Sequence, residues 1–208
     1  MIGNQVDINL FLCQFSSMSK LLKLRNNLQS GLFTTQKALK NGLSKKDLIY
    51  LLENNVITRL ARGVYCQAGY DFSEEDQAVL ATLIVGLPSV LCLLSALSYH
   101  QLTDIIPKKT WMMVPAEKRT QQVQLRLFRS TNPQWNTGVQ KEKGYWVTDT
   151  ERTLVDCLVQ KRWLGSQTAV EALRQAIKDQ KTTLDKVLRM AVRLKVEHRI
   201  ITTIEALA

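Results

Sequence analysis

Histidine is scarce in this chain, because the 208 residues include only His100 and His198. A catalytic triad or a metal site built on histidine would have to use one isolated imidazole. The sequence also lacks the GxxxxGK[ST], GxGxxG, GxSxG and HExxH motifs of nucleotide-binding proteins and hydrolases. It contains no Glu-x-Lys of the kind used by metal-dependent nucleases. We therefore predict no enzyme activity, no catalytic residue, no metal and no cofactor.

Paired cysteines and long apolar runs are absent as well. The four cysteines lie far apart in apolar segments, so we expect free buried thiols in a reducing compartment: Cys13, Cys66, Cys92 and Cys157. No apolar run reaches the roughly 20 residues that a membrane helix needs. The first 17 residues lack the charged start and the cleavage pattern of a signal peptide. We expect a cytoplasmic protein with no membrane partner.

Acidic residues are few in one stretch in particular. Residues 18–66 contain nine basic and two acidic residues, a net charge of +7, although the whole chain carries +10. Residues 67–149 are neutral overall, and residues 150–208 carry +4. A short segment with this excess and a regular apolar pattern is typical of a folded module that binds a polyanion.

Three helices and a hairpin are predicted in this basic segment. Serine and threonine precede each helical pattern as N-caps, with Ser19 before residues 20–28, Thr34 and Thr35 before residues 36–40, and Ser44 before a helix that ends near Glu53. Asp47, three residues after Ser44, suggests a capping box. Strands at residues 57–60 and 64–66 follow. This order predicts a winged helix-turn-helix domain over residues 18–68, after an N-terminal extension of residues 1–17.

The third helix and the hairpin supply the candidate DNA-binding residues. Leu48, Leu51 and Leu52 should face the core, which turns the opposite side of the helix outward. In the hairpin ITRLARGVYC, Gly63 can take the positive φ of a tight turn, and two arginines lie near the tip. The alternatives are a merely solvated helix face, and arginines that pair with Glu53 or the acidic DFSEED segment. The predicted DNA-binding residues are Ser44, Lys45, Lys46, Tyr50, Arg59 and Arg62.

Residues 69–208 are predicted to form a mixed α+β domain that ends in a helical bundle. We expect helices at residues 74–85 and 90–102, strands at 110–116, 122–129 and 144–147, and helices from Thr150 onward. Near the end, Lys186, Arg189 and Arg193 recur at helical spacing opposite apolar residues, namely Leu184, Leu188 and Ala191. These three cations are either a second binding face, for RNA or an acidic partner, or a solvated helix surface.

Two further patterns have a structural and a chemical interpretation. Arg152 and Asp156 are four residues apart at a helix start, where an ion pair is the simpler interpretation than catalysis. His100 follows Leu97 on a mainly apolar helix, where we expect a partly buried, hydrogen-bonded histidine rather than a ligand or base.

Three segments in sequence order resemble the AbiEi antitoxins of type IV toxin-antitoxin systems. They are GLSKKDLIYLLENNVITRLARGVY, LLSALSYHQLT and WVTDTERTLVDCL, and the resemblance extends from about Leu22 to the C-terminal helices. It implies an N-terminal winged helix that binds inverted repeats in its own promoter and represses the operon. It also implies a C-terminal domain that counters the partner AbiEii toxin, a nucleotidyltransferase, without necessarily forming a stable complex with it.

Two other functional classes remain open from the sequence. One is an enzyme that acts on nucleic acid or on the toxin, with the basic module as a tether. The other is an RNA-binding module, because basic charge alone does not distinguish RNA from DNA. Tyr50 is the one aromatic residue expected to be exposed among the basic residues of the front module, whereas single-strand binding usually needs several stacking aromatics.

Overall fold

The computed structural model describes residue 16, residues 18–23, residue 26 and residues 31–205. The chain divides into two compact units between Ile84 and Val85. Each unit contains helices and a β-sheet, so the chain belongs to the mixed α+β class, as predicted. The predicted boundary after residue 68 stays a prediction. Apart from Ser16, the predicted extension of residues 1–17 lies outside the described residues.

The first unit combines short helices with a three-stranded antiparallel sheet. β1 (Leu32–Thr34) leads directly into α2 (Thr35–Lys40), and residues 41–44 connect α2 to α3 (Lys45–Glu53). The hairpin of β2 (Ile57–Ala61) and β3 (Val64–Gln67) follows, and α4 (Glu74–Val85) begins after it. The strand order is β1-β3-β2, with β3 antiparallel to both neighbours. The sheet therefore joins the strand before α2 to the hairpin after α3.

Thr34 and Ser44 are confirmed as N-caps, whereas Thr35, the other cap candidate, is the first residue of α2. The Thr34 hydroxyl oxygen accepts a hydrogen bond from the Lys37 amide at 3.2 Å. At α3, the Ser44 hydroxyl oxygen accepts from the Asp47 amide at 3.1 Å, and Asp47 Oδ2 accepts from the Ser44 amide at 2.7 Å. This reciprocal capping box satisfies donors that an open helix end would leave without partners.

The described part of the first helical pattern differs from the prediction. Ser16 and Met18 already have helical backbone, so Ser19 lies inside the helix and does not begin it. Its hydroxyl donates to the carbonyl oxygen of Ser16 at 3.0 Å, a bond that serine commonly makes within helices. Residues 24–25 and 27–30, which include the predicted end of this helix, lie outside the described residues.

The second unit is built on a five-stranded mixed sheet. Its order is β6 (Leu125–Ser130), β5 (Thr110–Pro115), β4 (Val90–Leu91), β8 (Trp146–Thr148) and β7 (Val139–Lys141). β5 is parallel to β6 and antiparallel to β4, whereas β8 is parallel to β4 and antiparallel to β7. The short β4 is thus the central strand.

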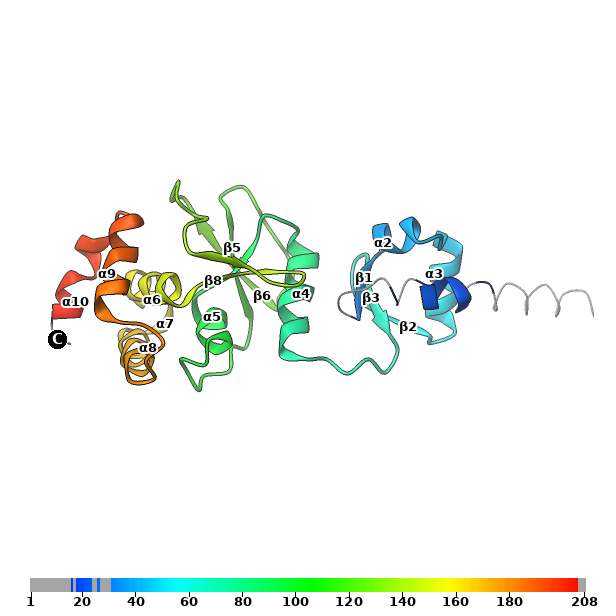
Figure 1. Cartoon of the computed structure of the whole chain (residues 1–208). Helices are drawn as coiled ribbons and strands as arrows, with labels where there is room; N and C mark the ends of the chain where they lie inside the picture. The colour runs from blue at the N-terminus through cyan, green and yellow to red at the C-terminus, as the bar shows by residue number, and fades with distance from the viewer. Residues whose placement is uncertain (1–15, 17, 24–25, 27–30, 206–208) are drawn as a thin grey trace, which may run out of the picture. The chain divides into compact units, whose positions relative to one another are not determined.

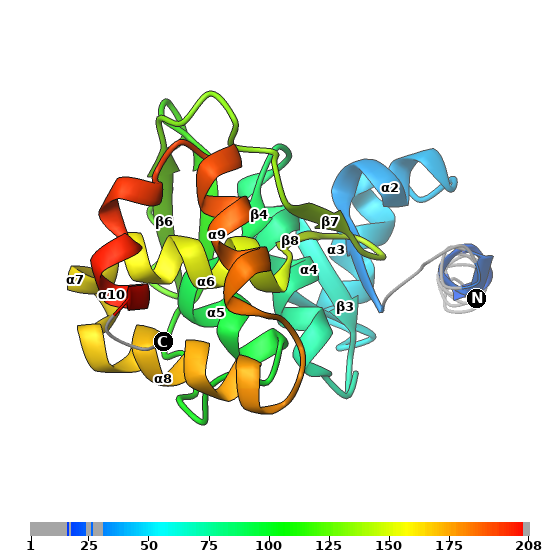
Figure 2. The same ribbon diagram turned by 60° about the vertical axis from the view of Figure 1, so that its left-hand side comes forward.

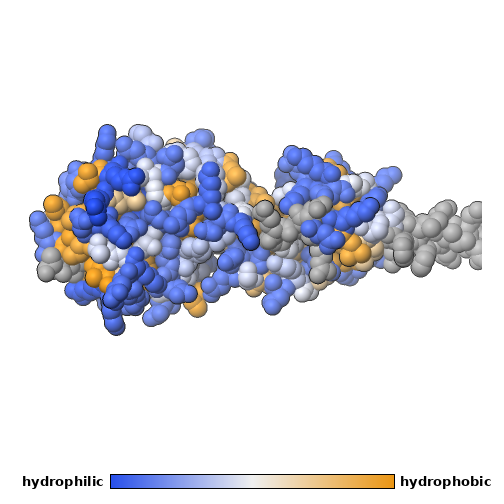
Figure 3. All heavy atoms as spheres, in the orientation of Figure 1, coloured by the Kyte–Doolittle hydropathy of each residue, from blue (hydrophilic) through white to orange (hydrophobic). Residues whose placement is uncertain are grey.

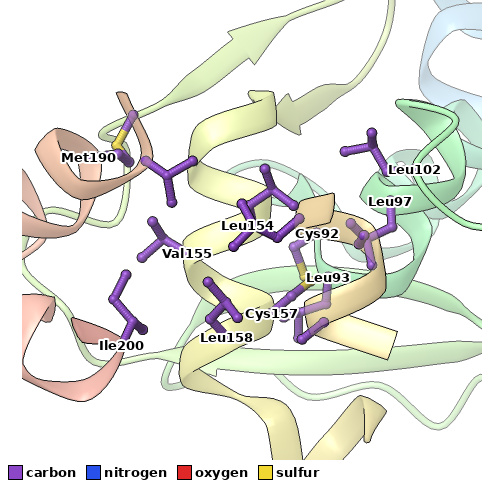
Figure 4. Packing of buried hydrophobic residues seen from close by; sticks show 14 of the residues in the cluster. Cys92, Leu93, Leu97, Leu102, Leu154, Val155, Cys157, Leu158, Met190 and Ile200 are labelled. Atoms are coloured by element: carbon purple, nitrogen blue, oxygen red, sulfur yellow. The ribbon is translucent and has the colours of Figure 1, made fainter. Parts of the chain in front are cut away.

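Helices lie beside this sheet or stack behind the helices that do, as Figure 1 and Figure 2 show. They are α5 (Leu93–Tyr99), α6 (Thr150–Val159), α7 (Lys161–Leu164), α8 (Ser166–Lys178), α9 (Leu184–Arg193), the 3-10 helix η1 (Glu197–Arg199) and α10 (Ile201–Glu205). α6 supplies the middle of the core, where its Leu154 and Leu158 belong to the same cluster of buried residues as Leu97 of α5 (Figure 4). The predicted helical bundle at the end of the chain is confirmed in its described residues.

Several predicted elements of the second unit need correction. The helix predicted over residues 90–102 is instead β4 followed by α5, because Val90 and Leu91 are buried between two neighbouring strands. The strand predicted from residue 122 begins at Leu125, since Val123 is 78% exposed and has no partner strand. The strand predicted at residues 144–147 is β8, at residues 146–148, and β7 was not predicted.

Of the four cysteines, three lie in the described residues. Cys66, Cys92 and Cys157 are free and buried, as predicted, whereas Cys13 lies outside the described residues. Burial raises the pKa of the Cys92 and Cys157 thiols well above their ordinary value, so both are neutral. No helix among the described residues is long and apolar enough to cross a membrane.

Candidate nucleic-acid interface

The helix α3 has a buried side and an exposed cationic side. Leu48 and Leu51 lie in the core of the first unit with Phe33 and Tyr65, and Leu52 packs against that core, as predicted. Lys45 and Lys46 are exposed, and Tyr50 is partly exposed. Burying the leucines therefore fixes which way the two lysines point.

Ile49 is the residue of this face that the sequence analysis missed. Its side chain is 55% exposed, although isoleucine is usually buried. It lies four residues after Lys45 and three after Lys46, so all three share one side of α3. The helical spacing that selected the lysines also selects Ile49, but only charged and polar residues were considered on that side of the helix.

Ser44 has a structural role at the start of the same helix. Its hydroxyl oxygen accepts the Asp47 amide within the capping box, while the side chain remains exposed. The hydroxyl proton is still available to donate to a phosphate oxygen. Ser44 can therefore orient α3 and contact a ligand with the same group.

The hairpin tip is held against the start of α2. Gly63 has a φ of +74°, in the left-handed region that glycine adopts readily, as predicted. Its carbonyl oxygen accepts a hydrogen bond from the Thr35 amide at 2.9 Å. The pairing of β2 with β3 shifts register between Arg59 and Ala61, which is a β-bulge and increases the local twist. The two arginines are therefore displayed from a tip whose backbone is anchored.

Arg59 and Arg62 are both exposed. Arg59 Nε donates to the Ala61 carbonyl oxygen at 3.3 Å, which holds its side chain along the hairpin. Within the described part of the chain, neither arginine forms an ion pair, so the clasp with Glu53 or the DFSEED segment is not formed in this structure. Hydrophilic side chains cover much of the visible face of this unit (Figure 3).

The second predicted basic face lies in the second unit. Lys186, Arg189 and Arg193 of α9 are all exposed, and Arg189 Nη2 pairs with Asp185 Oδ2 at 2.6 Å. On the opposite side, Ala191 is buried as predicted, but Leu184 and Leu188 are only partly buried. The buried residues of α9 are Val187, Met190 and Ala191. The buried face of the helix therefore lies around these residues, and not around Leu184 and Leu188 as predicted.

The two residues with alternative chemical interpretations have structural partners. Arg152 Nε donates to Asp156 Oδ2 at 2.8 Å, which confirms the predicted ion pair. The Nε2–H of His100 donates to the Thr148 carbonyl oxygen at 2.7 Å, and burial lowers the pKa of its imidazole. Among the residues that the structure describes, no group of three His, Cys, Asp or Glu side chains could hold a metal ion.

The predicted binding residues form two separate sets. α3 and the hairpin carry one set in the first unit, and α9 carries the other in the second. Comparison with known proteins finds no family model that matches the chain and no similar curated protein.

Proposed function

We propose that the first unit is a winged helix-turn-helix module that binds double-stranded DNA. In this proposal α3 is the recognition helix and the β2–β3 hairpin is the wing. We further propose that the chain is the antitoxin of a type IV toxin-antitoxin system, which represses its own promoter and counters a nucleotidyltransferase toxin. The resemblance of three segments to the AbiEi antitoxins supports this second part.

The observation that supports DNA binding best is the exposed face of α3 beside a short arginine hairpin. An α-helix with its side chains is about 10 to 12 Å across, and the major groove of DNA is about 12 Å wide, so a helix such as α3 can lie in it. Lys45 and Lys46 supply donors for guanine edges or phosphates, and Ile49 offers an apolar contact for a thymine methyl group. In this proposal Arg59 and Arg62 contact flanking phosphates.

A gel shift on the DNA upstream of its own gene tests this proposal. We expect tighter binding to that DNA than to a scrambled duplex or to tRNA. The variant Lys45→Ala, Lys46→Ala should lose about 1 to 3 kcal/mol per base contact at the upstream site. The matched control is Lys108→Ala, Lys109→Ala, another exposed pair of adjacent lysines, which lies in the second unit. The control should bind as the wild type does.

Three outcomes would contradict the assignment. Equal affinity for scrambled and upstream duplexes would remove the repressor function. Stronger competition by tRNA would favour an RNA-binding module. An equal loss in the control pair would mean that general positive charge, and not the face of α3, determines binding.

A further inference from the structure

A cavity in the second unit has no role in the proposed DNA binding. It is a half-open cavity of ≈ 490 Å³, and it is lined by the end of β6, residues 131–134, α6, the turn after α9 and η1. This volume lies within the range of about 300 to 1,000 Å³ that is usual for small-molecule sites. Its lining contains charged groups of both signs, so it suits a ligand that carries both an anionic group and a hydrogen-bond donor.

Besides the buried Arg152, three exposed cations line the cavity from three different segments. Arg129 comes from β6, Lys195 from the turn after α9, and Arg199 from η1, and all three are exposed. Arg129 Nε donates to the Lys118 carbonyl oxygen at 3.1 Å, and Arg199 Nη2 donates to the Val159 carbonyl oxygen at 3.3 Å. Each guanidinium keeps further donors, and none of the three cations forms an ion pair within the described residues. Such a set suits a phosphate group.

A carboxylate lies among these cations on the α6 side. Asp156 lines the cavity with a side chain that is 14% exposed, and its Oδ2 accepts from Arg152 Nε. Burial raises the pKa of this carboxyl, and the neighbouring guanidinium opposes that rise. The carboxylate is an acceptor for an N–H group of a ligand, whereas a simple anion would be repelled by it.

The backbone around the cavity is fixed by hydrogen bonds. Asn132 Nδ2 donates to the Leu194 carbonyl oxygen at 3.1 Å, and Asn132 Oδ1 accepts from the Gln134 amide at 2.9 Å. The side chain of Asn132 thus ties the loop after β6 to the end of α9. A cavity whose walls are already connected loses little conformational entropy when a ligand binds.

Lys195 occupies a backbone position where glycine is the usual residue. Its φ is +58°, and its amide donates to the Val192 carbonyl oxygen at 2.9 Å in the turn that ends α9. A non-glycine residue is strained in this conformation. The position therefore carries a cation at the cavity although a smaller residue would fit the backbone better.

We propose that this cavity binds a nucleotide, with its phosphate held by Arg129, Lys195 and Arg199 and an amino group of its base donating to Asp156. A nucleotide combines an anion with an N–H edge, which matches cations and a carboxylate in one cavity. Inorganic phosphate satisfies only the cations. The proposal concerns the second unit alone, so it stands independently of DNA binding by the first.

Calorimetry on the full chain with AMP, CMP, GMP, UMP and inorganic phosphate tests the proposal. We expect Kd values below about 1 mM for the three bases with an amino group, and binding at least about tenfold weaker for phosphate. UMP, whose base has a single ring N–H and no amino group, should bind more weakly than the other three nucleotides. A 5′-phosphorylated trinucleotide shows whether the site takes a free nucleotide or the end of a strand.

Two variants localise the binding. Lys195→Gly should weaken all nucleotides about tenfold while thermal stability stays equal or rises, because glycine removes the backbone strain. The matched control is Gln180→Gly, which changes another residue with positive φ, at 55°, that does not line the cavity. Asp156→Asn should reduce the preference for AMP, CMP and GMP over UMP. Phosphate binding as tight as the nucleotides, or unchanged binding by the Lys195 variant, would overturn the proposal.

Discussion

Arg152 is a buried cation whose donors are distributed over the second unit. Its side chain is 2% exposed, and besides Asp156 it contacts the Thr137 carbonyl oxygen at 2.7 Å and Met113 Sδ at 3.6 Å. It thereby ties α6 to the segment before β7 and to β5. The ion pair was predictable from the spacing of four residues, but the additional partners were not, because they lie far away in sequence.

Replacing Arg152 tests this structural role. We expect Arg152→Met to destabilise the protein by about 3 to 5 kcal/mol, because it leaves the Asp156 carboxylate without its cation in a poorly solvated place. The double variant Arg152→Met, Asp156→Leu should recover part of this loss. Urea unfolding measures both, with the exposed Arg174→Met of α8 as control. If the free energy of unfolding of Arg152→Met lies within about 0.5 kcal/mol of the wild-type value, Arg152 does not have this role, because ordinary surface substitutions have effects of that size.

His100 makes the stability of the second unit depend on pH. Burial lowers the pKa of its imidazole below the ordinary value of 6.5, so the unfolded chain binds the proton more readily than the folded chain. The stabilising contribution is therefore present above pH 6.5 and is lost as pH falls towards the lowered pKa. We expect the free energy of unfolding in urea to fall less between pH 7.5 and pH 5.5 in His100→Gln than in the wild type. An equal loss in both proteins would mean that other groups cause the dependence.

At the scale of elements, local signals predicted the helices of the first unit better than the strands of the second. The start of α3 was predictable from Ser44 and Asp47, because the two residues of a capping box are only three positions apart in the sequence. β4 could not be predicted in this way, because its two residues are held by partners near residues 112 and 147. The cavity cations show the same limit, since Arg129 and Lys195 are distant in sequence and only the fold brings them together.

The hairpin is the element whose contribution to DNA binding is easiest to separate. We expect Arg59→Ala, Arg62→Ala to weaken binding to every duplex and to make the slope of log K against log salt shallower by about two units. Titration at several salt concentrations measures this. Arg162→Ala, Arg174→Ala, two exposed arginines of the second unit, remove the same charge and serve as the control. An unaltered slope together with faster proteolysis near Gln67 would indicate a structural clasp instead.

At the scale of the whole molecule, the two basic sets allow the two proposed activities to be separated. We expect Lys186→Glu, Arg189→Glu, Arg193→Glu to abolish rescue from the toxin while operator binding is retained. The control Arg162→Glu, Arg174→Glu, Lys178→Glu changes the net charge equally at other exposed positions of the second unit. Growth of cells that co-express the toxin measures rescue. Full rescue by the α9 variant would show that α9 is only a solvated surface.

The central position of β4 also sets the order in which the second unit can be completed during synthesis. β4 leaves the ribosome before every other strand of its sheet, yet one of its two neighbours, β8, ends at Thr148. Until that residue has been translated, one edge of β4 has no partner and its apolar residues are open to other chains. A transcript truncated between β6 and β8 therefore yields an aggregation-prone product.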